Sequence, residues 1–130
     1  MNITEFNSKF TELEIQGTGI DCQTKKDLTW TDKTTGQVVY SIPAGQHVHL
    51  WFSPKKHSNR AFIQHNGEVK VTRLENANSK FTKIIKAPSL RSLEKQDGDG
   101  ICKTVTGQRV EPDGFGCDGS PSWLLVLGLM

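Results

Sequence analysis

Hydrophobic and polar residues alternate with a period of two from Leu28 to about residue 84, a pattern typical of half-buried β-strands. β-Branched and aromatic residues are frequent in this region, and both residue types favour pleated structure. Turn-forming segments divide the region, so the strands must be short. We expect strands at 28–32, 37–42, 46–52, 60–65 and 68–74, and a further short strand around 81–85.

Asn66-Gly67 is the clearest turn signal in the chain. The two residues supply the positive φ angles of a type I′ turn, and alternating segments flank them on both sides. The pattern therefore predicts a β-hairpin here, with Val69, Val71 and Leu74 facing the core.

The pattern changes to that of a helix near both ends of the chain. At the N-terminus, hydrophobic residues recur on one stripe of a helix over 3–13, and Gly17 and Gly19 end that region. Near the C-terminus, Ser89 is a typical N-cap for a helix over the segment SLRSLEK. The segment Ser-Pro-Ser-Trp at 120–123 starts another helix.

Together these elements predict an α+β protein that is mainly β and forms a single domain over residues 1–130. The strands within residues 28–86 are expected to form a five-stranded small barrel or a strongly bent antiparallel sheet. The N-terminal helix precedes this sheet, and residues 87–130 form a C-terminal cap. The cap is expected to contain a hairpin over 101–110 and a helix on either side of it.

Part of the predicted sheet resembles a known family of small barrels. The segments TGQVVYSIPAGQHVHL and FIQHNGEVKV place a Pro/Gly turn between two short strands and an Asn-Gly turn before the closing strand. Residues 36–73 thereby resemble bacterial Src-homology-type small β-barrels, although Phe62-Ile63 stands where that family commonly has a tryptophan. The resemblance implies a barrel fold, and members of the family bind peptides, cell-wall glycans or nucleic acids.

The charges along the chain are unevenly distributed, although the net charge is only +2. Residues 46–91 contain nine basic and two acidic residues, a balance of +7. Residues 1–45 have four basic and six acidic residues, and residues 92–130 have three and six, so their balances are −2 and −3. A basic central segment between acidic ends indicates a local anionic partner. The alternative is a solvated lysine-rich surface that has no partner.

The basic segment also contains aromatic residues, and this combination is typical of nucleic-acid binding, where cations replace counterions along the phosphates and flat side chains stack on bases. We therefore predict a non-catalytic nucleic-acid-binding module, from a prokaryote or its mobile elements, with Trp51 and Tyr40 as stacking residues. In the alternative arrangement Trp30 and Trp51 belong to the core, which removes base stacking but leaves phosphate binding possible. The residues expected to contact phosphates are Lys55, Lys56, Arg60, Lys70, Arg73, Lys80, Lys83 and Lys86.

The last eight residues, Trp123–Met130, are almost wholly apolar but too few to cross a bilayer. They must be buried in the core or against a partner, and burial in the core is the favoured interpretation. If they dock instead on another chain or on a second copy, the protein is an interaction or assembly module. No longer apolar run and no secretory signal pattern is found, so a cytoplasmic protein without membrane contact is expected.

Metal binding through histidine is a third interpretation of the central segment. His47 and His49 project to the same face of the predicted strand, and His57 or His65 can supply a further ligand. No acidic residue occurs between 46 and 67, however, so surface imidazoles without a metal are the favoured interpretation.

Neither the cysteine spacing nor a search for catalytic motifs indicates a cofactor or an active site. Cys22, Cys102 and Cys117 do not follow a metal-binding spacing. They are expected to be reduced thiols, two of them buried, with a Cys102–Cys117 disulfide as the alternative. No phosphate-binding loop, nucleophile elbow or zinc-protease motif is found, which favours a protein without catalytic activity.

Overall fold

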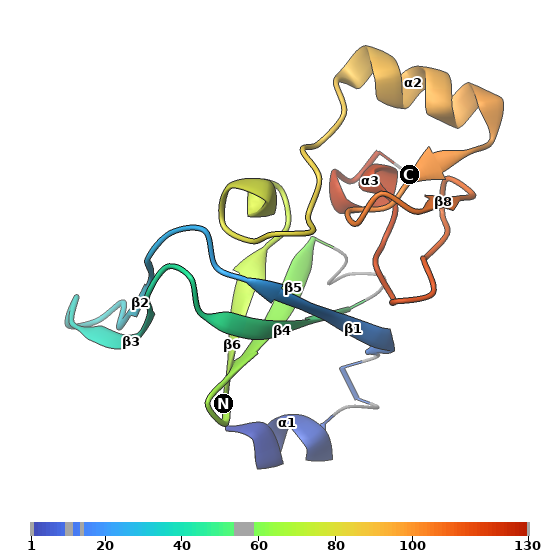
Figure 1. Cartoon of the computed structure of the whole chain (residues 1–130). Helices are drawn as coiled ribbons and strands as arrows, with labels where there is room; N and C mark the ends of the chain where they lie inside the picture. The colour runs from blue at the N-terminus through green and yellow to red at the C-terminus, as the bar shows by residue number, and fades with distance from the viewer. Residues whose placement is uncertain (1, 10–11, 14, 54–58, 130) are drawn as a thin grey trace.

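An antiparallel four-stranded sheet lies at the centre of the protein, with the strand order β1-β4-β5-β6 (Figure 1). The computed structural model describes residues 2–9, 12–13, 15–53 and 59–129. The four strands are β1 (Gln16–Gln23), β4 (His47–Phe52), β5 (Arg60–His65) and β6 (Glu68–Arg73). The helix α1 (Ile3–Ser8) is tied to the β5–β6 turn, because the Ile3 N–H donates a hydrogen bond to the Gly67 carbonyl oxygen.

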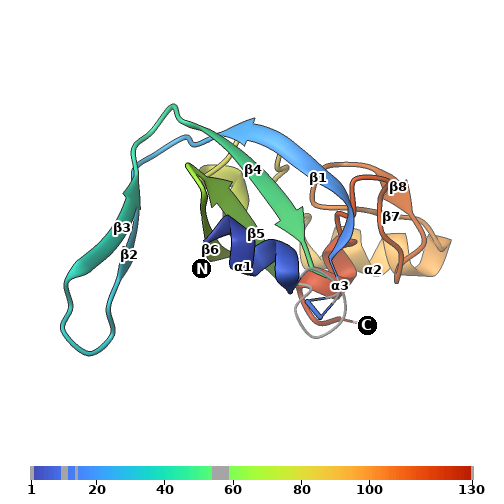
Figure 2. The same cartoon turned by 90° about the horizontal axis from the view of Figure 1, so that it is seen from below.

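β2 (Leu28–Thr31) and β3 (Val38–Ile42) form a separate hairpin, which lies between β1 and β4 in the chain. The hairpin projects from the sheet as an arm (Figure 2). At its turn the Asp32 carboxylate accepts hydrogen bonds from the backbone N–H groups of Thr34 and Thr35, and these bonds lower the pKa of Asp32. The tip of the arm is thus closed by local hydrogen bonds.

The elements that follow β6 are short, and most of them agree with the sequence predictions. The Ser89 hydroxyl accepts the Ser92 N–H at the start of α2, and the Ser122 hydroxyl accepts the Leu125 N–H at the start of α3. The helix after Ser89 and the hairpin within 101–110 are confirmed. The C-terminal helix is also confirmed, but it begins at Trp123, so Pro121 precedes its cap instead of standing in its first turn. The elements are η2 (Ala77–Ser79), α2 (Leu90–Asp99), β7 (Cys102–Lys103), β8 (Arg109–Val110) and α3 (Trp123–Val126).

The main hydrophobic core lies between one face of the sheet and the C-terminal elements. Alternate residues of β4 point into it, and Val48, Leu50 and Phe52 are all buried. Leu93 from α2 and Trp123 from α3 belong to the same core. The C-terminal elements, together with the segment around η2, therefore share one core with this face of the sheet and help to remove it from water.

A smaller hydrophobic cluster lies on the opposite face of the sheet. Phe6 of α1 packs there with Phe62 of β5 and Val69 of β6, and all three are buried. Trp51 of β4 packs against this cluster and remains half-buried. The N-terminal helix therefore shields the face that the C-terminal elements leave uncovered.

Strand β1 was not predicted from the sequence, because Gly17 and Gly19 were interpreted as the end of the preceding helical region. Gly17 and Gly19 both have positive φ angles, and the register of β1 against β4 shifts between Gln16 and Ile20. Glycines and a register shift interrupt the period-two alternation by which a strand is recognised. A bulged strand of this kind has no clear hydrophobic pattern.

Two predicted elements differ in the structure. The helix predicted over 3–13 ends at Ser8, and residues 10 and 11 lie outside the described part of the chain. The strand predicted over 81–85 is absent, apart from a single β-bridge at Phe81. Lys83 has a φ of +66°, a conformation that a continuous strand does not contain.

The protein is α+β and mainly β, as predicted, but its sheets are not closed into a barrel. Among the described strands, β1 and β6 are the edges of an open sheet, and β2 and β3 pair only with each other. The five-stranded barrel is therefore not confirmed. None of the described helices combines the length and the apolar character that crossing a lipid bilayer requires.

Candidate nucleic-acid interface

A cleft of about 550 Å³ lies between the hairpin and the edge strand β6. Its walls come from β2 and the hairpin turn, from the ends of β5 and β6, and from the segment after η2. We call it the arginine cleft, because two of the four basic side chains among its described lining residues are arginines. Its charged and aromatic residues are Asp27, Trp30, Lys33, Arg60, Arg73 and Lys80.

Arg60 and Arg73 stand directly opposite each other where β5 pairs with β6. At the next position, the Leu74 N–H donates a hydrogen bond of 2.8 Å to the Asn59 carbonyl oxygen. Hydrogen-bonded and non-hydrogen-bonded pairs alternate along an antiparallel ladder, so the arginines form a non-hydrogen-bonded pair, the type with the closest side chains. Like charges in such a pair destabilise a sheet. The pairing therefore lowers stability unless an anion lies between the two guanidinium groups.

No carboxylate neutralises these cations within the part of the chain that the structure describes. Neither arginine forms an ion pair there, and neither do Lys33 and Lys80. Asp27, the acidic residue of the cleft, instead accepts a hydrogen bond of 2.8 Å from the Ala44 N–H. The cleft therefore presents a net positive charge to solvent.

Lys80 is half-buried, whereas the other three cations of the cleft are exposed. Its carbonyl oxygen accepts the Lys25 N–H at 2.7 Å, which fixes the segment after η2 beside the end of β1. Burial lowers the pKa of Lys80, and the charge of Lys26 lowers it further. A bound anion favours the charged form and thus opposes both effects.

Trp30 forms the aromatic part of the cleft. Its Nε1–H donates a hydrogen bond of 3.0 Å to the carbonyl oxygen of Val71. Val71 belongs to a non-hydrogen-bonded pair with β5, so this carbonyl points to the outer edge of the sheet. The ring is half-buried, with its centroid 6.1 Å from that of Tyr40. Trp30 therefore attaches the hairpin to β6 and places an indole next to the cations.

The structure brings together three of the eight basic residues that the sequence assigned to phosphate contact. Arg60, Arg73 and Lys80 all line the arginine cleft. Lys33 joins them from the hairpin turn, although it belongs to the acidic first third of the sequence. Two of the eight, Lys55 and Lys56, lie outside the described residues.

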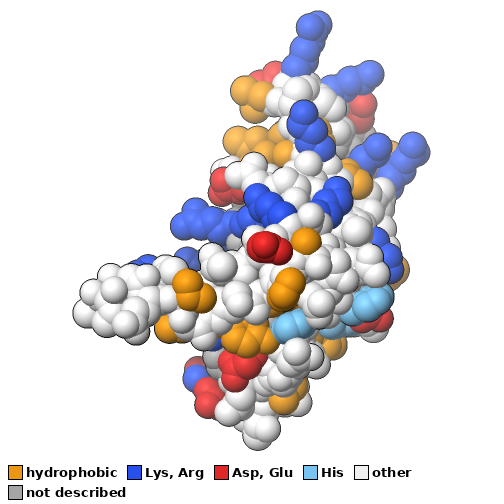
Figure 3. All heavy atoms as spheres, turned by 60° about the vertical axis from the view of Figure 1, so that its left-hand side comes forward, with side chains coloured by type: hydrophobic (Ala, Val, Ile, Leu, Met, Phe, Trp, Pro, Cys, Tyr) orange, Lys and Arg blue, Asp and Glu red, His pale blue; other side chains and the backbone are white. Residues whose placement is uncertain are grey.

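The remaining predicted phosphate contacts lie elsewhere. The Lys70 ammonium is 5.3 Å from the centroid of the Tyr40 ring and 3.8 Å from Glu68 Oε2. Lys83 borders a different pocket, and Lys86 is exposed. Figure 3 shows Lys and Arg side chains from the base of the hairpin to the far end of the molecule. The basic residues are therefore spread over the surface, with one local concentration in the arginine cleft.

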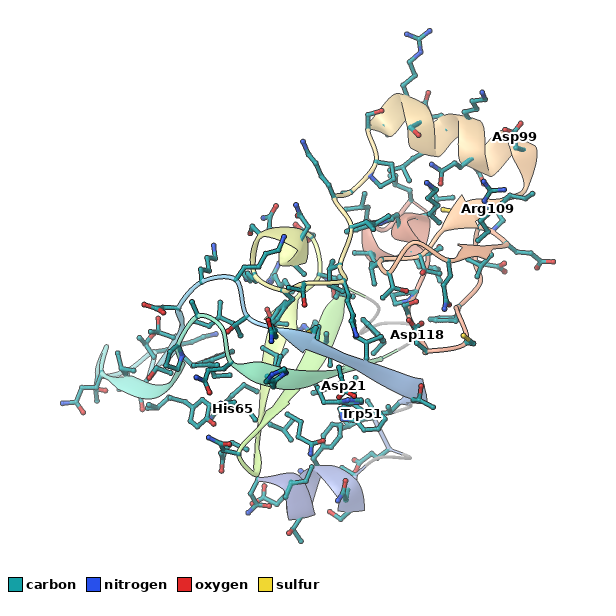
Figure 4. The ribbon with its side chains drawn as sticks, in the orientation of Figure 1. Asp21, Trp51, His65, Asp99, Arg109 and Asp118 are labelled. Atoms are coloured by element: carbon teal, nitrogen blue, oxygen red, sulfur yellow. The ribbon has the colours of Figure 1, made fainter. Side chains whose placement is uncertain are left out.

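The two predicted stacking residues do not line the arginine cleft, where Trp30 stands instead. Trp51 packs against α1 and donates its Nε1–H to Gln64 Oε1 at 3.1 Å. The Tyr40 hydroxyl lies 2.6 Å from His65 Nδ1, and burial raises the pKa of Tyr40. Figure 4 shows Trp51 on the side of the sheet towards β1 and His65 on the side towards the hairpin. Trp51 is partly covered, but neither it nor Trp30 is fully buried as the alternative arrangement expected.

His49 is held by two oxygens. Its Nδ1 lies 2.6 Å from Asp21 Oδ1, and its Nε2 lies 2.8 Å from the Thr18 carbonyl oxygen. Both oxygens only accept, so both contacts are hydrogen bonds when the ring carries both protons. The bond from His49 lowers the pKa of Asp21. Among the described residues, no three His, Cys, Asp or Glu side chains gather in a group suited to a metal ion.

We expect Asp21→Asn to lower the melting temperature slightly near neutral pH. The pKa of Asp21 is depressed in the folded state, so its stabilising contribution is present above the unfolded-state pKa of about 3.9. It is lost as the pH falls through the folded-state pKa. The effect is small because Asp21 is exposed. Thermal melts across a pH series check this, and a difference that persists at the lowest pH would contradict it.

All three cysteines are free thiols. Cys22 and Cys102 are buried, and Cys117 is exposed. Burial raises the pKa of the Cys22 thiol to about 12. Since the thiolate is the reactive form, Cys22 is chemically inert at neutral pH.

The apolar C-terminal segment is largely buried within its own chain. Trp123, Leu124 and Val126 each expose 3% or less of their surface, whereas Leu129 exposes 47%. Burial in the core, the favoured interpretation of this segment, is therefore confirmed for these three residues. What remains accessible to a partner is the end of the segment, of which Met130 lies outside the described residues.

Known proteins give no guide to the role of the arginine cleft. Comparisons of the chain with protein-family models, with curated proteins and with solved structures found no match. The geometry and charge of the cleft are therefore the basis for assigning a function.

Proposed function

We propose that the protein is a non-catalytic nucleic-acid-binding module and that its arginine cleft contacts phosphates. The observation that carries this proposal is the pair Arg60 and Arg73, which stand opposite each other with no carboxylate partner among the described residues. An anion between two guanidinium groups replaces their repulsion by two charge-assisted contacts. The planar donor fork of arginine matches phosphate oxygens in particular.

The other residues of the cleft favour a nucleic acid over a simple anion. Lys33 and Lys80 add two further cations to the same cleft, from the hairpin turn and from the segment after η2. Trp30 adds an aromatic ring in the same cleft. Cations with an adjacent aromatic side chain are the combination that binds the phosphates and the bases of a strand together.

We expect the double variant Arg60→Gln/Arg73→Gln to weaken binding to labelled single-stranded DNA or RNA about 10- to 100-fold. Each arginine contributes charge-assisted hydrogen bonds to phosphate. Four cations in contact with phosphates give a slope of log affinity against log salt of roughly −3 for a single strand, and the variant reduces it to roughly −1.5. Fluorescence anisotropy titrations at several salt concentrations, with duplexes alongside, measure both quantities.

The matched control removes the two other arginines of the sequence, as Arg91→Gln/Arg109→Gln. Both are exposed and line no part of the cleft, and Arg109 lies at the end of the molecule with α2 (Figure 4). This variant has the same net charge as the first and is expected to keep nearly full affinity. The first variant should also melt no lower than the native protein, since it relieves the repulsion within the arginine pair. Equal losses in the two variants, or affinity that hardly depends on salt, would contradict the proposal.

A further inference from the structure

The arginine cleft concentrates more positive charge than an internal phosphate of a strand can neutralise. Among the described residues, four cations and one carboxylate line it, so the net charge of this part of the lining is +3. An internal phosphodiester carries a single negative charge, whereas a phosphate monoester carries about −1.5 to −2 at pH 7. A strand end that bears a monoester next to the first diester therefore matches the charge of the cleft better than mid-strand phosphates do.

The shape of the cleft also favours a group that enters it. Its volume of about 550 Å³ lies in the range of sites that enclose small ligands, roughly 300–1,000 Å³. The hairpin borders one side and β6 the other, and the half-buried Lys80 belongs to the same lining. A terminal group can enter a cleft bordered on two sides more readily than the middle of a strand can.

The arginine pair is suited to a phosphate with several free oxygens. Side chains of directly opposed residues begin about 4.5–5.5 Å apart at their Cβ atoms, so Arg60 and Arg73 can converge on one group. Each guanidinium can donate two parallel hydrogen bonds. A monoester has three terminal oxygens to accept them, and a diester has two.

We infer that the arginine cleft binds the terminal phosphate monoester of a nucleic-acid strand. Arg60 and Arg73 hold the phosphate oxygens, Lys80 adds a third cation, and the terminal base lies against Trp30. This inference rests on the proposed function, since it names the part of the nucleic acid that enters the cleft. It predicts that the protein distinguishes strands of identical sequence by the chemistry of their ends.

The test is a comparison of one labelled single strand in three forms, with a phosphate at the 5′ end, at the 3′ end, or at neither end. We expect the native protein to bind one of the phosphorylated forms at least about tenfold more tightly than the unphosphorylated form. In the Arg60→Gln/Arg73→Gln variant this preference should disappear, while Arg91→Gln/Arg109→Gln should keep it. The first comparison uses only the native protein, so it does not depend on the folding of a variant.

The outcomes separate this inference from the proposed function. Equal affinity for all three forms, with the salt dependence and the arginine effect intact, would overturn the terminal site and leave nucleic-acid binding standing. No measurable binding of any form would overturn both. A free nucleoside monophosphate that competes as well as the phosphorylated strand would overturn the assignment to a strand end.

A pH series adds a readout that depends on the ligand. The second pKa of a phosphate monoester is about 6, so the terminal group loses charge as the pH falls below that value. The preference for the phosphorylated strand should therefore shrink below about pH 6, while the unphosphorylated strand shows no such transition. A preference that stays constant through this range would contradict recognition of the doubly charged monoester.

Discussion

Replacement of Gly19 by alanine is expected to lower the free energy of unfolding by about 2–5 kcal/mol. Gly19 lies in β1 with a φ of +68°, a conformation that strains any residue with a Cβ atom. A Cβ at this position would also overlap the Leu50 carbonyl oxygen and the His49 ring of the paired strand. Urea unfolding followed by fluorescence or circular dichroism measures the change.

Gly45→Ala separates the two causes. Gly45 has a φ of +81°, but no atom lies within 4 Å of the position where its Cβ would stand. Only backbone strain remains, so this variant should lose about 1 kcal/mol. If Gly45→Ala and Gly19→Ala are equally destabilised, the close approach of β1 to β4 contributes nothing, and our description of this contact is wrong.

Truncation of the core tryptophan, Trp123→Ala, should lower the free energy of unfolding by about 3–5 kcal/mol. Trp123 is completely buried at the start of α3, in the main core. The variant leaves a cavity between α3 and the sheet as well as losing the transfer free energy of the indole. Urea unfolding again measures the loss, and gel filtration shows whether the protein changes its oligomeric state.

Trp123→Phe is the conservative control for this variant. The Trp123 Nε1 atom is buried and has no hydrogen-bond partner among the described residues. Phenylalanine removes this unsatisfied donor while keeping most of the apolar volume, so its loss should be much smaller than that of alanine. If Trp123→Ala instead leaves stability unchanged but dissociates an oligomer, the C-terminal segment is an interface and the assembly interpretation is favoured.

Local signals explain the parts of the fold that the sequence predicted well. Asn66 and Gly67 have φ angles of +49° and +80°, as the predicted turn between β5 and β6 requires. Ser89 caps α2 through its hydroxyl group. Each of these features depends on residues next to one another in the chain, so a single sequence contains the information. Val71 shows the limit of the pattern, because it was predicted to face the core and exposes 44% of its surface on the edge strand.

The arginine cleft could be predicted only in part, because it depends on contacts between distant segments. Arg60, Arg73 and Lys80 were expected to bind phosphate from their place in a basic segment. Their convergence depends on the β5–β6 register and on the path of the chain after η2. Lys33 and Trp30 reach the cleft because the Trp30 hydrogen bond attaches the hairpin to β6, which no local pattern indicates. Charge balance along the sequence therefore identified some of the cations but not their grouping.

Strand β1 contacts both β4 and residues 118–119, and these contacts have a consequence for folding during synthesis. One edge of β1 pairs with β4, while the Gly19 N–H donates to the Asp118 carbonyl oxygen and Gly17 lies against the backbone at Gly119. On the ribosome, the partners of Gly17 and Gly19 at residues 118 and 119 are synthesised about a hundred residues after β1. The nascent sheet therefore keeps this part of its edge incomplete until residues 118 and 119 have been synthesised, and premature termination before Asp118 should yield chains prone to aggregation.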